Sequence, residues 1–162
     1  MEHLWSPWRL SYVSGGAKSV GCVFCDAQRN DEATPLVLFQ GTTCFVILNL
    51  FPYNNGHLLV VPKRHFAALA EATHDELCEL ASLVQRSELV LKEAYDPQGL
   101  NVGINLGKPA GAGILEHLHV HVVPRWNGDT NFMTVLGQTR VLPEELPATG
   151  DRLRPIFERL SQ

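Results

Sequence analysis

The sequence has no apolar segment long enough to cross a bilayer. Its longest apolar run is CFVILNLFP at residues 44–52, whereas a membrane-spanning helix needs about 20 residues. The segment MEHLWSPWRLSYVSGG at residues 1–16 carries an acid at position 2 and lacks the basic-then-apolar order of a signal peptide. We therefore expect a soluble, cytoplasmic protein that has no membrane partner.

An excess of positive charge is also missing. The 17 acidic and 13 basic residues give a formal net charge of -4, so no general electrostatic field attracts a nucleic-acid backbone. We expect no nucleic-acid partner, and any phosphate group must be bound by a local arrangement of residues.

Internal repeats, low-complexity tracts and breaks in composition are absent from the 162 residues. With 45% hydrophobic residues, the chain is long enough to bury a sizeable core. We expect a single domain over residues 1–162, with its core at about residues 20–126 and an extension at each end.

Apolar runs bounded by turn residues predict an antiparallel sheet. The predicted strands are, in chain order, LVLF (36–39), TCFVIL (43–48), HLLVVP (57–62), NVGIN (101–105) and the histidine-rich EHLHVHVVPRW (116–126). In the C-terminal extension, FMTVL (132–136) is a candidate sixth strand, and DRLRPIFERL (151–160) predicts a short helix interrupted by Pro155.

One long helix is predicted between the third and fourth strands. It opens with THDE, in which Thr73 and Glu76 form a reciprocal capping box, and it ends at YDPQG (95–99). Its expected apolar face consists of Leu77, Leu80, Ala81, Val84 and Leu91. The predicted fold class is α+β, with about five antiparallel strands and the long helix packed on the sheet.

Three histidines, His117, His119 and His121, alternate with apolar residues in the last predicted strand. Residues two apart on a strand are about 7 Å apart, so the three side chains cannot all bind one metal ion. Clustered imidazoles lower one another's pKa, and a neutral imidazole is a nucleophile towards phosphorus. The segment AGAG (110–113), just before this strand, lets backbone N–H groups approach an anion closely. The pattern favours phosphoryl or nucleotidyl transfer over the alternative of a solvated polar face.

These residues resemble a known family. His-x-His-x-His followed by two apolar residues is the signature of the histidine triad (HIT) family of nucleotide hydrolases and transferases, and Asn49, eight residues before His57, resembles the family's ribose-binding position. The segments LWSPWR, FPYNNGHLLVVP, NVGINLG and EHLHVHVVPRWNGDTNF are similar to the bacterial branch related to diadenosine tetraphosphate phosphorylase. The resemblance covers about residues 4–135 and implies a HIT-like fold.

The resemblance also implies catalytic roles. His119 attacks the α-phosphorus and forms a nucleotidyl-histidine intermediate, which water or inorganic phosphate then resolves. His121 contacts the phosphate oxygens, and His57 completes the polar wall around them. For His57 the alternative is a histidine that simply begins a strand.

Nucleotide contacts are implied for five further positions. Asn49 is expected to bind the ribose, Phe45 and Ile47 to flank the base, and Asn105 to contact a phosphate or the leaving group, although Asn105 equally fits a turn residue. Many relatives carry Gln or Ser shortly before the triad, where this chain has Gly113. The acceptor, water or phosphate, is therefore left open.

The pair Cys22 and Cys25 has the spacing of half a zinc site. By resemblance, His65 and His117 are the other two ligands of a structural zinc ion. A pair of free thiols or a redox pair are the alternatives. Cys44 and Cys78 lie in apolar patterns and are expected to be buried.

The function implied is cleavage of the α-phosphate linkage of dinucleoside polyphosphates, such as diadenosine tetraphosphate, by phosphorolysis or hydrolysis. The alternatives are an adenosine phosphoramidate-type hydrolase and a non-catalytic nucleotide sensor. The resemblance further implies a homodimer.

Overall fold

In the computed structural model, residues 21–29, 35–129 and 144–161 are described. The candidate strand at residues 132–136 lies outside these residues. Within the described residues, no helix combines the length and the apolar character needed to cross a membrane.

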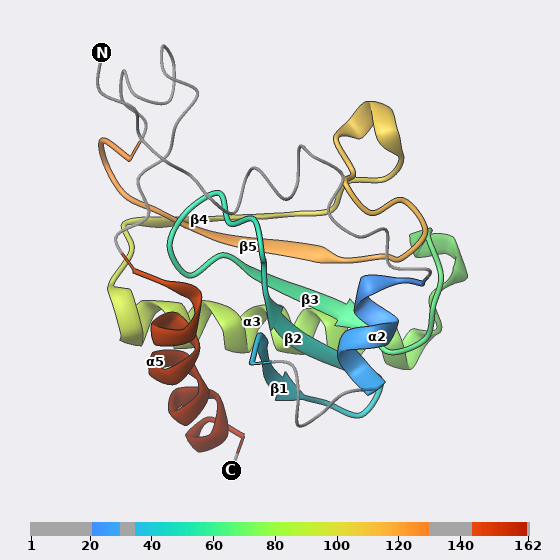
Figure 1. Cartoon of the computed structure of the whole chain (residues 1–162). Helices are drawn as coiled ribbons and strands as arrows, with labels where there is room; N and C mark the ends of the chain where they lie inside the picture. Colours follow the sequence, from blue (N-terminus) through green and yellow to red (C-terminus); the bar gives the residue numbers. More distant parts are fainter. Residues whose placement is uncertain (1–20, 30–34, 130–143, 162) are drawn as a thin grey trace.

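The core is a five-stranded antiparallel sheet with the order β1-β2-β3-β5-β4 (Figure 1). Its strands are β1 (Val37–Gln40), β2 (Cys44–Leu48), β3 (Leu58–Pro62), β4 (Gly99–Gly103) and β5 (Val120–Arg125). The expected α+β fold is confirmed. Strand β4 begins two residues earlier than the predicted NVGIN strand, and β5 begins only at Val120. Of the three alternating histidines, only His121 lies within a regular strand.

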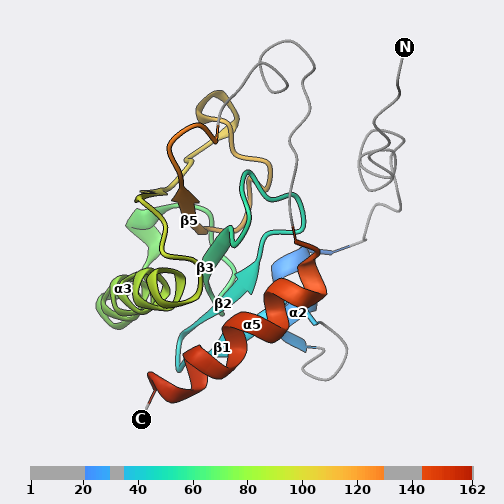
Figure 2. The same cartoon turned by 90° about the vertical axis from the view of Figure 1, so that its left-hand side faces the viewer.

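Both faces of β2 and β3 are covered, and every residue of the two strands is buried. Val46 and Val60 face the long helix α3 (His74–Tyr95), whereas Phe45 and Val61 belong to a second cluster with residues of the short helix α2 (Val23–Arg29). The two views show α3 and α2 on opposite sides of the sheet (Figures 1 and 2). The continuous apolar sequences of both strands follow from this double burial. Helix α2 itself was not expected from the sequence.

Helix α3 begins as predicted, because the Thr73 side chain accepts from the Glu76 N–H and the Glu76 carboxylate accepts from the Thr73 N–H. Its expected apolar face was partly wrong, since Leu77 is 40% exposed and Ala81 is also exposed. The buried stripe consists of Glu76, Leu80, Leu83, Ser87, Val90 and Leu91. In this orientation Leu80, Leu83, Val90 and Leu91 pack in the main core, and Glu76 pairs with Arg64, the residue two positions after β3, at 2.8 Å.

The orientation of α3 also shows that the prediction of a buried Cys78 thiol was wrong. Cys78 is exposed, next to His74 on the outer surface of α3, whereas Cys44 is buried as expected. Burial raises the pKa of the Cys44 thiol to about 11.

The C-terminal helix α5 (Leu146–Arg159) is longer than predicted, and Pro155 does not interrupt it. Pro155 is exposed, so the carbonyl group that loses its N–H donor can face solvent. Leu153 and Phe157 are fully buried in the main core and hold the helix against it. Two short 3-10 helices complete the described chain, η1 (Leu69–Glu71) and η2 (Lys108–Ala110).

Candidate active site and metal cluster

A cavity of about 620 Å³ lies beside the start of β5. Its walls are mostly apolar, with a few polar groups, as is usual for sites that bind small molecules. The lining residues are Val23, Phe24, Ala27, Leu36, Ile47, Leu48, Asn49, Leu50, Phe51, Tyr53, Leu59, Gly111, Gly113, Ile114, His119 and His121.

The side chain of His119 is buried at the wall of this cavity. Its Nδ1 atom lies 2.9 Å from the carbonyl oxygen of His117. Because a carbonyl oxygen can only accept, Nδ1 carries the proton of the neutral ring, and the free lone pair is on Nε2. Burial lowers the pKa of His119, which keeps the imidazole neutral and nucleophilic.

His121 has the opposite tautomer. The Tyr53 N–H donates to Nδ1 of His57 at 3.0 Å, so the proton of the His57 ring is on Nε2. That Nε2–H donates to Nδ1 of His121 at 3.0 Å, which leaves the His121 proton on its own Nε2. His121 therefore has a hydrogen-bond donor where His119 has a lone pair. Burial, and next the neighbouring His119, lower the pKa of His121 to about 4.

His57 is almost completely buried and stands behind His121 rather than in the cavity wall. The Nδ2 atom of Asn49 lies 3.3 Å from its Nδ1 atom and 3.4 Å from its Nε2 atom. The Oδ1 atom of Asn49 accepts from the Phe51 N–H at 3.0 Å. Asn49 thus links the turn after β2 to the histidine pair while it lines the cavity.

Of the other four residues expected to bind nucleotide, two line the cavity and two do not. Ile47 and Gly113 line the cavity, but Phe45 is fully buried beneath it and does not line it. Asn105 lies next to the lining residue Gly111, since a Cβ atom at Gly111 would be 3.9 Å from its Nδ2. Asn105 is therefore at the rim of the cavity and not inside it.

Three aromatic residues that line the cavity were missed in the sequence, Phe24, Phe51 and Tyr53. Tyr53 lines the cavity and stacks on His121, with ring centroids 5.9 Å apart and an angle of 15° between the planes. Phe24 lies 5.2 Å from the ring of His119, centroid to centroid. The only sequence signals were their positions, Tyr53 inside the turn before His57 and Phe24 between the two cysteines.

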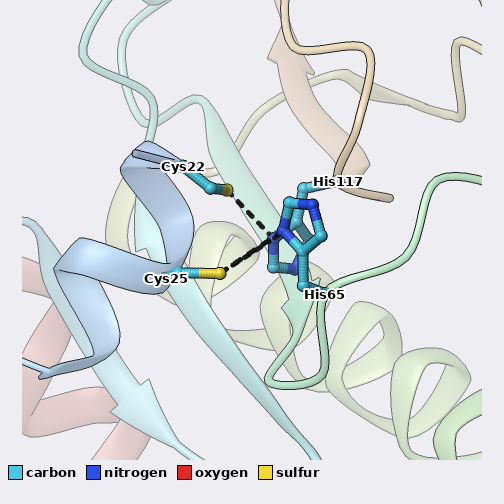
Figure 3. Close-up of side chains that lie close together, drawn as sticks. All are labelled: Cys22, Cys25, His65 and His117. Carbon is cyan, nitrogen blue, oxygen red and sulfur yellow. Dashed lines mark hydrogen bonds between the residues drawn. The ribbon is translucent and has the colours of Figure 1, made fainter. Parts of the chain in front are cut away.

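Cys22, Cys25, His65 and His117 come together in a second site, with ligand atoms that all lie within 4.8 Å of one another (Figure 3). The Nε2–H of His117 donates to the carbonyl oxygen of Pro62 at 2.8 Å, so its Nδ1 lone pair faces the cluster. That Nδ1 atom is 3.2 Å from the Cys22 sulfur and 3.2 Å from Nδ1 of His65.

The donor set and its spacing fit zinc. Tetrahedral bonds of about 2.0 Å to nitrogen and 2.3 Å to sulfur place ligand atoms about 3.3 to 3.8 Å apart. Four of the six separations between the ligand atoms, 3.2 to 3.7 Å, agree with this geometry, and all six lie within 4.8 Å. His117 is thus directed to the cluster, whereas His119 and His121 line the cavity.

Comparisons with known proteins show which proteins this chain is similar to. The chain is similar to the AP-4-A phosphorylase of Mycobacterium tuberculosis, with 40% identity over 157 residues that cover 92% of this chain and 80% of the relative. It also resembles a Zn-bound histidine triad family protein from Mycobacterium smegmatis, with a TM-score of 0.70 and 31% identity over 87% of this chain and 96% of that one.

A hypothetical histidine triad nucleotide-binding protein from Sulfolobus tokodaii gives a TM-score of 0.71 and 32% identity, over 86% of this chain and 94% of the other. The model of the HIT domain matches residues 30–128, which include the turn before His57 and all three alternating histidines. The chain therefore belongs to the HIT domain family.

Proposed function

We propose that the chain cleaves the α-phosphate linkage of dinucleoside polyphosphates, such as diadenosine tetraphosphate, through a nucleotidyl intermediate on His119. The observation that carries the proposal is the pair of opposite tautomers at the cavity wall. His119 has a free lone pair on Nε2, and His121 has a proton on Nε2. A nucleophile and a hydrogen-bond donor thus stand side by side, with ring centroids 4.9 Å apart.

The first step follows from these tautomers. The Nε2 lone pair of His119 attacks the α-phosphorus, a P–N bond forms, and the P–O bond to the leaving phosphate chain breaks. The Nδ1–H of His119 continues to donate to the carbonyl oxygen of His117, which stabilises the positive charge that develops on the ring. The Nε2–H of His121 donates to a phosphate oxygen, and His57 holds His121 in that tautomer.

In the second step an oxygen of water or of inorganic phosphate attacks the same phosphorus. The P–N bond breaks, and its electron pair returns to Nε2 of His119. With diadenosine tetraphosphate, phosphate as acceptor gives ADP and ATP, and water gives AMP and ATP. The AP-4-A phosphorylase of M. tuberculosis, which is similar over most of this chain, supports phosphate as the acceptor.

The nucleotide would lie with its base against the apolar wall that contains Ile47 and with its ribose at Asn49. The Oδ1 atom of Asn49 accepts one backbone N–H and retains a second lone pair for a ribose hydroxyl. Phe45 would act from beneath the wall, since it is fully buried. Gly113 and Asn105 would face the phosphates from the loop that contains η2.

Cys22, Cys25, His65 and His117 would hold a structural zinc ion. Their spacing and the Zn-bound relative from M. smegmatis support this assignment. Bound zinc would supply a cross-link between three segments far apart in the sequence. The catalytic residues His119 and His121 do not belong to this ligand set.

We further propose that residues 1–162 form one domain that assembles as a homodimer in the cytoplasm. Strand β4 is at an edge of the sheet, and its Val102 side chain is 53% exposed. An exposed edge strand with an apolar side chain favours pairing with a second copy. Four free cysteines fit a reducing compartment.

The decisive experiment is an incubation with diadenosine tetraphosphate, with and without inorganic phosphate, followed by identification of the products. ADP and ATP that appear only with phosphate would show phosphorolysis, and AMP and ATP without phosphate would show hydrolysis. His119→Ala should abolish both. Full activity of that variant would refute the assignment of the nucleophile.

The same assay separates the alternatives. Turnover of adenosine phosphoramidate without turnover of the dinucleotide would indicate the phosphoramidate-type hydrolase. Binding of AMP without turnover of either substrate, and without a covalent nucleotide on His119 after rapid mixing, would indicate a nucleotide sensor.

A further inference from the structure

Helix α2 belongs to both sites of the molecule. Cys22 immediately precedes it and Cys25 lies within its first turn, and both thiols face the metal cluster (Figure 3). Three other residues of the helix, Val23, Phe24 and Ala27, line the cavity. The short segment of Cys22 and α2 thus carries two of the four cluster ligands and part of the cavity wall.

Phe24 is the point at which the two sites meet. Its side chain is 4% exposed, and its ring packs edge-on against His117, with centroids 5.4 Å apart. The same ring lies 5.2 Å from His119 at an angle of 51°. Phe24 therefore contacts a proposed metal ligand, the proposed nucleophile and the cavity itself.

Within the described residues, α2 has two kinds of attachment to the rest of the chain. The polar contacts are those of the Cys22 and Cys25 thiols with His65 and His117, which lie in the loops after β3 and before β5. The remaining attachment is apolar, through Phe24 and Ala27, which pack on Phe45, Ile47, Leu59 and Val61. A helix of seven residues has little stability of its own, so contacts with the rest of the chain, these two attachments among them, hold it in place.

We propose that Phe24 couples the metal cluster to the nucleotide cavity, so that zinc binding tightens nucleotide binding. Zinc fixes Cys22 and Cys25 relative to His117, and this holds the Phe24 ring against His119 and keeps the α2 wall of the cavity in place. Phe24 acts as a positioning residue, because it contacts the proposed nucleophile without taking part in bond formation. The proposal rests on the nucleotide site assigned above.

Coupling between two sites is reciprocal, so nucleotide must tighten zinc binding by the same factor. We expect the dissociation constant of AMP, measured by titration calorimetry, to be about fivefold or more higher in zinc-free than in zinc-loaded protein. The dissociation constant of zinc, measured by competition with a chromophoric chelator, should fall by the same factor when AMP is saturating. Neither measurement involves turnover.

Two variants at position 24 test whether the coupling between the two sites depends on Phe24. Phe24→Leu keeps an apolar side chain without the ring, and Phe24→Ala removes most of its volume. Both should still bind one equivalent of zinc, but the ratio of the two AMP dissociation constants should fall towards one. Leu50→Ala is the matched control, because Leu50 lines the same cavity but belongs to the turn after β2 and not to α2. This variant should weaken AMP binding in both forms and leave the ratio unchanged.

The outcomes are distinct. Equal AMP affinity with and without zinc in the unmodified protein would overturn the coupling and leave the proposed reaction intact. A ratio that persists in Phe24→Leu and Phe24→Ala would overturn the role of Phe24. If either variant lost zinc, the reciprocal zinc titration of the unmodified protein would decide whether the sites are coupled. Failure of AMP to bind in any form would overturn both the nucleotide site and this proposal.

Discussion

The buried imidazole of His121 should make the stability of the protein depend on pH in a way that one substitution removes. Burial lowers the pKa of His121 from 6.5 to about 4 in the folded chain, whereas the unfolded chain returns it to its ordinary value. At a pH between these two pKa values, His121 binds a proton in the unfolded state but not in the folded state. Stability from this group is therefore complete above pH 6.5 and is lost as pH falls towards 4.

The size of the effect follows from the two pKa values. A fall from 6.5 to about 4 corresponds to about 3 kcal/mol in full. Between pH 7 and pH 5 the linkage relation gives a loss of about 2 kcal/mol in the free energy of unfolding. The carboxyl groups of Glu76 and Glu144, whose pKa values are lowered to about 2 by hydrogen bonds and ion pairs, titrate mainly below this window.

The assay is urea unfolding at pH 7 and pH 5 of the unmodified protein and of His121→Gln, which cannot titrate. The other buried histidines remain in both proteins, so the difference between the two pH dependences isolates His121. We expect the loss on going from pH 7 to pH 5 to be about 2 kcal/mol smaller in His121→Gln. His74→Gln is the control, because His74 is exposed at the start of α3. An identical pH dependence in His121→Gln and the unmodified protein would refute the assignment of His121 as a buried neutral base.

Three further predictions concern the glycines and the cluster. A Cβ atom at Gly113 would meet nothing within 4 Å, so Gly113→Ser should leave the melting temperature unchanged. A serine hydroxyl that donates to a phosphate oxygen should raise kcat by about fivefold. An unchanged kcat would place Gly113 away from the phosphates. Gly56 has φ +74, and its Cβ would lie 3.0 Å from a Leu91 methyl group, so Gly56→Ala should lower the unfolding free energy in urea by about 2 kcal/mol. Cys25→Ser should lose one equivalent of zinc by metal analysis and, at a zinc concentration of 100 times Kd, lower Tm by about 8 °C; retention of both metal and Tm would exclude Cys25 as a ligand.

The sequence predicted the sheet well because its strands are bounded by strong turn residues, and because β2, β3 and most of β5 are buried. The capping box of α3 was equally clear, since Thr73 and Glu76 act within one helical turn. The rotation of that helix about its axis was not clear, because it depends on how Leu83, Val90 and Leu91 pack against the sheet and on the partner of Glu76, Arg64, which lies after β3. Helix α2 was missed because seven residues are too few to show a helical period.

The roles of the three histidines depend on partners that the spacing of the motif does not reveal. His117 is turned to the cluster by the carbonyl oxygen of Pro62, at the end of β3, and His121 is fixed by His57. Only the partner of His119, the carbonyl of His117, is local in sequence. Alternation on a strand predicts that such residues share a face, but the tautomer of each ring is set by the donor or acceptor that the fold brings to it.

Because each tautomer depends on such a partner, the segment 117–121, only part of which lies in β5, suits the proposed chemistry. In a regular strand His117, His119 and His121 would be equivalent, and each backbone carbonyl would be directed to a neighbouring strand. Because β5 begins only at Val120, the carbonyl of His117 is available to accept from Nδ1 of His119. The irregular segment before β5 thus holds the nucleophile in the required tautomer. The first residues of the regular strand place the donor, His121, beside it.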